Sequence, residues 1–169
     1  PHITHWDHFH RKDTLSLPAC TQRQRDYSAT AGRRNVFTPE MVINGQYSAV
    51  GSQRKKVFNF IRMARQNPLA PVKIERMANT LTISLPDIKP GAYNLTLLHY
   101  KAQQKQDIKS GENRGRSVEY AAPVSAIKPL KPWDGRAATR AVTIDNGNPY
   151  VAVMVQQKQG GRIVAAGRL

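Results

Sequence analysis

The hydrophobic positions of this 169-residue chain follow two different patterns. From residue 72 onward, short runs of alternating apolar and polar residues are separated by Gly and Pro turns, as in "VKIERMANTLTISLPDIKPGAYNLTLLHY". Such evenly spaced runs are typical of small antiparallel sandwiches or barrels. Residues 1–68 instead mix β-favouring runs with helical periods. The pattern therefore predicts an α/β domain over residues 1–68 and an all-β domain, a small antiparallel β-sandwich, over residues 69–169, which meet at "NPLAP" (67–71).

Two helices are expected in the first domain. One opens after Gly51-Ser52, because the next apolar residues recur at i, i+3, i+4 and i+7 and so form one stripe; they are Val57, Phe60, Ile61 and Ala64. The other is expected over roughly residues 20–31. Thr21 can serve as its N-cap, and Gly32 stands where a C-terminal glycine belongs.

The stretch "NVFTPEMVING" (35–45) predicts a strand that one proline interrupts. Val36-Phe37 and Met41 to Ile43 favour β-structure, and Asn44-Gly45 predicts a hairpin turn. Proline cannot donate a ladder hydrogen bond, so Pro39 belongs at the first residue of a strand or in a loop. A trans proline that closes a loop is the ordinary interpretation, and a cis Thr38-Pro39 bond is the alternative.

The chain is strongly basic, with 26 Lys and Arg against 11 Asp and Glu and a net charge of +15. Such a balance favours acidic protein surfaces, anionic lipid headgroups or nucleic acid as partners. No RNP-like strand, zinc-finger spacing or recognition helix accompanies the charge, so no specific nucleic acid is expected. No apolar run is long enough to span a membrane, so no transmembrane segment is expected.

Neither thiol nor metal chemistry has a complete set of residues in the sequence. Cys20 is the sole cysteine, and a lone thiol behaves either as a small hydrophobe or as a pairing partner for something outside the chain. Four imidazoles occur in "HITHWDHFH" (2–10), at a spacing that matches no established metal site. We therefore expect no metal site, no cofactor and no catalytic residue in these 169 residues.

Several blocks of the sequence resemble the motifs of one protein family. They are "HITHWDHFHRKD" (2–13), "CTQRQRDY" (20–27), "VFTPEMVINGQYSAVGS" (36–52), "SGENRGRSVEYAAPVSAIKPL" (110–130) and "PWDGRAAT" (132–139). In this order they resemble the exported, thioredoxin-like bacterial family called domain of unknown function 1223. The resemblance implies part of a thioredoxin-like domain followed by a β-sandwich, a cis Pro39, and a place in the periplasm or cell envelope.

The resemblance also implies where a site would lie. Trp6 and Asp7 match the family's W-D, and they either line a groove beside Thr38 and Pro39 or simply pack and cap a turn. A second candidate is the loop that follows Gly111, which either binds a ligand or is a turn held by an Arg–carboxylate pair; its residues are Glu112, Asn113, Arg114 and Arg116.

Two functions of different classes follow from this reading. The first is a non-catalytic interaction or structural protein of the bacterial cell envelope, such as a subunit of a large envelope or secretion assembly, with acidic partners. The second is a periplasmic thiol–disulfide oxidoreductase, which needs a C-x-x-C motif at a helix N-terminus. The family's motif would lie upstream of Pro1, so the chain as given is expected not to be an enzyme.

Overall fold

The computed structural model describes the whole chain except residues 1, 5–14, 109–113, 146–148 and 159. Of the described residues, 46 % lie in strands and 17 % in helices. The helices are α1 (Pro18–Thr30) and α2 (Arg54–Arg65). The strands are β1 (Glu40–Ile43), β2 (Tyr47–Val50), β3 (Ala70–Pro71), β4 (Lys73–Met77), β5 (Thr80–Leu85), β6 (Tyr93–Tyr100), β7 (Gln103–Asp107), β8 (Ser117–Ala121), β9 (Val124–Trp133), β10 (Ala138–Thr143), β11 (Val151–Gln156) and β12 (Ile163–Arg168).

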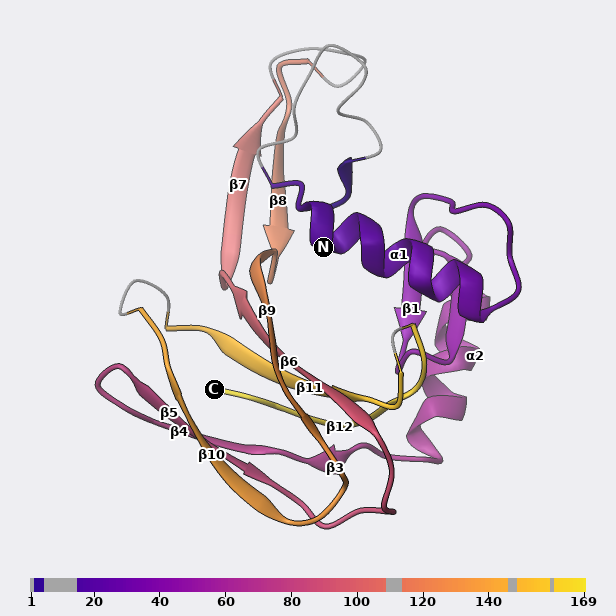
Figure 1. Ribbon diagram of the computed structural model, residues 1–169. Helices are drawn as coiled ribbons and strands as arrows, with labels where there is room; N and C mark the ends of the chain where they lie inside the picture. Colours follow the sequence, from indigo (N-terminus) through magenta and orange to yellow (C-terminus); the bar gives the residue numbers. More distant parts are fainter. Residues whose placement is uncertain (1, 5–14, 109–113, 146–148, 159) are drawn as a thin grey trace.

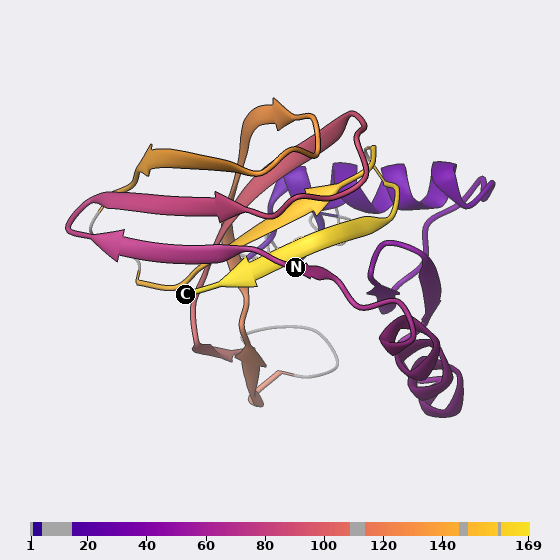
Figure 2. The ribbon, with the colours of Figure 1, turned by 90° about the horizontal axis from the view of Figure 1, so that it is seen from below.

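Two sheets hold the main hydrophobic core. One has five strands in the order β3-β12-β11-β6-β9, and the other has three in the order β10-β5-β4 (Figures 1 and 2). All neighbouring pairs are antiparallel except β12 and β3. The alternating pattern places one face of each strand inward. The fully buried side chains from both sheets form one cluster, which includes Leu81, Ile83, Leu95, Leu97, Val151, Val153 and Val155.

The helices and the β1–β2 hairpin lie together at one side of these sheets (Figure 1). The hairpin turn follows the Asn44-Gly45 signal, and both residues have positive φ. Helix α2 packs on the hairpin, where Phe60 stacks on Tyr47 with ring centroids 5.1 Å apart. The turn also contacts the start of β12, because the Ile163 amide donates a hydrogen bond to the Asn44 carbonyl at 2.9 Å.

The sequence explains both ends of α1. Pro18 stands at the start, where its missing N–H costs nothing because the first amides of a helix have no intrahelical partner. Gly32 adopts φ +66° directly after the helix, and the next amide, that of Arg33, donates to the Ser28 carbonyl at 2.8 Å. The prediction of a C-terminal glycine at this position is confirmed.

The predicted fold class, a partial thioredoxin-like domain followed by a small antiparallel β-sandwich, is wrong. A thioredoxin-like α/β domain needs a central sheet that the hairpin extends, but in the described residues β1 and β2 pair only with each other. Over the residues that the structure describes, the chain is mostly β, in several sheets, and no thioredoxin-like α/β arrangement is evident. The boundary between residues 68 and 69 stays a prediction; α2 ends just before it and β3 begins just after it.

Two local predictions also change. Val36-Phe37 is not a strand, because α1 side chains bond to the backbone there: Ser28 donates to the Asn35 carbonyl at 2.8 Å and Gln24 to the Phe37 carbonyl at 2.7 Å. Thr21 is not the N-cap of α1, since that position is Leu17. Over the described residues, neither helix is long and apolar enough to cross a membrane.

Candidate functional site

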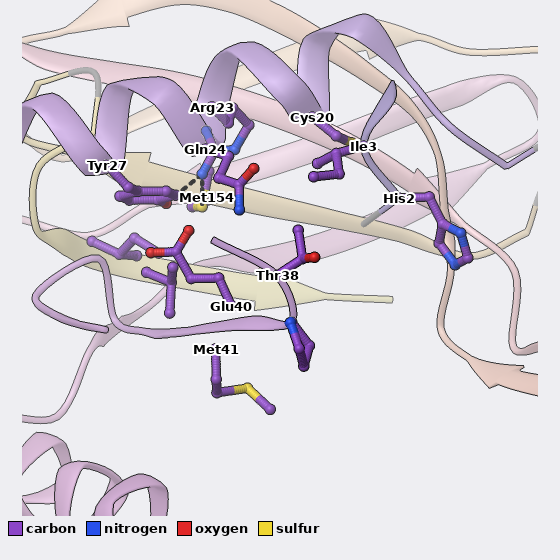
Figure 3. Close-up of a pocket in the computed structure, with 13 residues that line it drawn as sticks. His2, Ile3, Cys20, Arg23, Gln24, Tyr27, Thr38, Glu40, Met41 and Met154 are labelled. Carbon is purple, nitrogen blue, oxygen red and sulfur yellow. Dashed lines mark hydrogen bonds between the residues drawn. The ribbon is translucent and has the colours of Figure 1, made fainter. Parts of the chain in front are cut away.

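A cavity of about 490 Å³ lies between α1, the start of β1 and the paired ends of β11 and β12 (Figure 3). Most of its wall surface is apolar, although about half of the side chains that line it carry a polar group. Its lining residues are His2, Ile3, Cys20, Arg23, Gln24, Tyr27, Thr38, Pro39, Glu40, Met41, Val42, Met154 and Ile163. A concave, mostly apolar wall with polar groups placed along it is the usual form of a binding site.

The Thr38–Pro39 peptide bond is cis, as the family resemblance predicts. Both residues border the cavity from the side opposite α1. Pro39 is held in place by the end of the hairpin, because its carbonyl accepts the Gly51 amide at 2.8 Å. The chain therefore enters β1 along the cavity wall.

Arg23 is the half-buried cation of this wall. Its guanidinium donates to the Tyr27 hydroxyl at 2.5 Å and to the Gln156 Oε1 at 3.3 Å, and it lies 3.6 Å from the Met154 sulfur. The Gln156 amide in turn donates to Tyr27 at 3.1 Å and to the Gly161 carbonyl at 2.8 Å. All these partners are neutral, and the described residues offer Arg23 no carboxylate.

Glu40 carries the anionic charge of the cavity, but that charge already has a partner. Its side chain is 4 % exposed, and Oε1 accepts from Arg33 at 2.6 Å and from Ser48 at 2.5 Å. Arg33 also lies over the Phe37 ring, 4.8 Å from its centroid. Since Arg33 neutralises Glu40, the charge of Arg23 is the one at the wall that no described residue compensates.

A loop between β11 and β12 packs on α1 and on the hairpin turn through close backbone contacts. Gly160 lies under α1, and a Cβ there would stand 2.3 Å from the Asp26 carbonyl oxygen. Gly45 of the hairpin turn faces Gly161 in the same way, with its carbonyl oxygen 2.2 Å from the position of a Cβ. Only glycine fits such approaches, so the hairpin, the loop and α1 form one packed unit.

Cys20 faces the cavity as a buried thiol. Burial raises the pKa of the Cys20 thiol above its ordinary value, and the positive charge of Arg23 offsets this only partly. The thiolate is the reactive form of cysteine. Cys20 is therefore mostly the inert thiol at neutral pH, which favours its interpretation as a small hydrophobe.

Alkylation tests this assignment. At pH 8, iodoacetamide should modify Cys20 in the folded protein at least about tenfold more slowly than in the protein unfolded in guanidinium, because both burial and a raised pKa suppress the thiolate. The measurement is the intact mass over time. Equal rates in the two states would show an exposed, ordinary thiol.

The structure brings only some of the predicted site residues together. Thr38 and Pro39 line the cavity. Arg114 and Arg116 are exposed at the base of the β7–β8 hairpin loop and do not contribute to the lining. The remaining predicted residues, Trp6, Asp7, Glu112 and Asn113, lie outside the described residues.

Metal binding finds no support in the part of the chain that the structure describes, where no group of three or more His, Cys, Asp or Glu side chains converges. Of the histidines considered for such a site, His2 lines the cavity and packs edge-on against Tyr120 with ring centroids 4.4 Å apart. His5, His8 and His10 lie outside the described residues.

Sequence reasoning missed the polar group formed by Arg23, Tyr27 and Gln156. One signal was available, because Arg23 and Tyr27 are four residues apart and so share a helix face. Gln156 had no such signal, since it is 129 residues from Tyr27 and reaches it only through the packing of α1 on β11.

Comparisons place the chain among known proteins. A family model described as "Protein of unknown function (DUF1223)" matches residues 1–156. The crystal structure of protein AGR_C_4864 from Agrobacterium tumefaciens is similar, with a TM-score of 0.83 and 21 % identity, over 99 % of this chain and 77 % of that chain. At this identity the likeness shows the fold alone. No curated protein matches the chain.

Proposed function

The chain belongs to the family of proteins of unknown function DUF1223, and from the geometry of the cavity we propose that it is a non-catalytic interaction protein. The cavity between α1 and the β1–β2 hairpin receives an apolar segment of a partner protein. A carboxylate on that segment pairs with Arg23. The proposal rests on one observation above all: Arg23 lies at an apolar cavity with neutral partners only among the described residues.

The apolar wall suits a peptide segment rather than a polar metabolite. Met41, Met154 and Ile163 contribute to it from three separate strands. Methionine is unbranched and polarizable, so it adapts to partners of different shape. Burying one or two aliphatic side chains of a partner there removes apolar surface from water, which stabilises the complex.

The charge of Arg23 provides the specificity. A half-buried guanidinium loses part of its hydration, and a carboxylate ligand restores that interaction through charge-assisted hydrogen bonds. The net charge of +15 acts in the same direction at longer range, since it attracts acidic partners before contact. We accordingly propose acidic envelope proteins as the partner class, with the periplasm or cell envelope as the place of binding.

The chemistry of the Cys20 thiol also suits binding better than catalysis. The raised pKa of this thiol lowers its thiolate fraction, so it is a poor attacking group. An oxidoreductase that uses cysteines upstream of Pro1 stays a prediction of the sequence alone.

Binding of two matched peptides tests the proposed function. The probes are the acetylated, amidated tetrapeptides Leu-Val-Glu-Leu and Leu-Val-Gln-Leu, titrated by calorimetry against the whole chain. We expect the Glu peptide to bind about fivefold to tenfold more tightly, because a charge-assisted hydrogen bond adds about 1 kcal/mol or more at a partly exposed site. Arg23→Met should remove this preference.

Tyr27→Phe is the matched control, since it removes a neighbouring hydroxyl and leaves the Arg23 charge in place. It should keep the preference for the Glu peptide. A preference that survives in Arg23→Met would refute the role of Arg23. A third arm uses laurate: binding of laurate with no binding of either peptide would replace the protein partner with a fatty acid.

A further inference from the structure

The outward face of α2 is a second surface with its own chemistry. The helix carries five basic residues and no acidic one, namely Arg54, Lys55, Lys56, Arg62 and Arg65. All five side chains are exposed. None of them forms an ion pair with the residues that the structure describes. The face is therefore a compact cluster of free positive charge.

Exposed apolar side chains stand inside this cluster. Phe58 is 62 % exposed and Met63 is 42 % exposed. Helical spacing places Lys55 and Arg62 next to Phe58, because residues three and four apart lie on the same side of a helix. An aromatic ring surrounded by cations is the arrangement that inserts at the headgroup level of a lipid bilayer while the cations contact phosphates.

The position of the charges within α2 favours binding to an anionic surface. Arg54, Lys55 and Lys56 occupy the first turn, where the helix dipole is positive and anions are favoured. Neither an acidic residue in that turn nor a side-chain cap offsets them. In the isolated protein these cations interact unfavourably with the helix dipole and so destabilise α2. Contact with an anionic surface would replace this repulsion with attraction.

The helix is held firmly and projects outward, as a docking surface requires. Val57 and Ala64 are buried against the hairpin side, and Phe60 stacks on Tyr47. In Figure 2 α2 projects away from the two sheets. No residue of α2 lines the cavity, so this surface is separate from the proposed partner site.

We infer that the outward face of α2 docks the protein on an anionic lipid bilayer, with Phe58 inserted between headgroups and Lys55 and Arg62 on their phosphates. Lipid is favoured over an acidic protein surface because clusters of about four to eight Lys and Arg on a helix are typical of anionic-lipid binding, and the exposed Phe58 ring suits the headgroup level. The apolar face of α2 is already used by the hairpin, so the contact is peripheral and reversible.

Co-sedimentation of the whole chain with vesicles tests the inference. We expect binding to vesicles of phosphatidylglycerol and phosphatidylcholine in equal proportions, and at least about tenfold weaker binding to phosphatidylcholine alone. Each basic residue near the surface strengthens binding about fivefold, so Lys55→Gln with Arg62→Gln should weaken it about twenty-fivefold. Phe58→Ser should weaken it about fivefold through the lost insertion of the ring.

Matched controls separate this face from the general charge of the chain. Lys101→Gln with Lys131→Gln removes the same charge from exposed sites outside α2, and Met77→Ser removes an apolar side chain that is 83 % exposed. Both should bind vesicles within about twofold of the unmodified protein. Equal weakening by the α2 variants and these controls would overturn the inference. Polyglutamate is the second probe: binding of it through Lys55 and Arg62, with no vesicle binding, would assign α2 to an acidic protein instead.

Discussion

Replacing Gly45 with alanine should lower the free energy of unfolding by about 3 kcal/mol, since overpacking and left-handed strain add at this position. Gly45 has φ +68°, and its new Cβ would stand 2.2 Å from the Gly161 carbonyl oxygen and 3.1 Å from the Ile163 amide nitrogen. Backbone atoms cannot relieve the clash by changing rotamer, as a flexible side chain can. The hairpin and the β11–β12 loop would have to separate, and urea denaturation measures the loss.

Gly32→Ala is the control for this prediction. Gly32 has nearly the same φ, +66°, but nothing lies within 4 Å of a Cβ there. It should therefore lose only the strain of a left-handed residue, about 1 kcal/mol. If both variants lose the same amount, the contact of the hairpin turn with Gly161 contributes nothing to stability, and the packed unit of hairpin, loop and α1 is misassigned.

Glu40→Gln should cost about 2 kcal/mol of folding free energy, because breaking a buried pair leaves the other charge without a partner. The Glu40 side chain is 4 % exposed and the Arg33 side chain 26 %. The exposed part of Arg33 reduces the cost below that of a fully buried pair. Thermal or urea unfolding at neutral pH measures the change.

Glu75→Gln is the counterpart on the surface. Glu75 pairs with Lys73 at 2.8 Å, but the two side chains are 61 % and 75 % exposed, so water and salt screen the pair. We expect no measurable loss of stability. A loss in Glu40→Gln no greater than in Glu75→Gln would show that the Arg33–Glu40 pair does not stabilise the segment that leads into β1.

Local signals in the sequence predicted local structure well. The turn at Asn44-Gly45, the apolar side of α2 and the glycine after α1 depend on neighbouring residues, and all three are present. Val36-Phe37 failed because contacts with α1 overrode the local signal. Its β propensity is a weak preference, and hydrogen bonds from Gln24 and Ser28 of α1 took the backbone groups of this segment.

The fold class failed because it depends on which strands lie side by side. A strand, a proline and a hairpin indicate β-structure, but they do not say what the hairpin pairs with. In the described residues β1 and β2 have no further neighbour strand. The resemblance to a family identified the family, which the comparisons show, but its thioredoxin-like description did not carry over to this arrangement.

Only part of the candidate site was predicted from the sequence. Thr38 and Pro39 were chosen from a local motif, and both line the cavity. Arg23, the residue on which the proposed function depends, was one of 26 basic residues and stood out only after folding. Its neighbours Met154 and Gln156 come from β11, and such long-range contacts leave no trace in spacing along the chain.

The most direct test of the central claim uses the four methionines as reporters. Met41 and Met154 line the cavity, whereas Met63 and Met77 lie outside it. In methyl-labelled protein titrated with the Leu-Val-Glu-Leu peptide, the NMR signals of Met41 and Met154 should shift together, while those of Met63 and Met77 should stay unchanged. Signals of Met63 or Met77 that move while the cavity methyls remain still would contradict the claim that this cavity is the binding site.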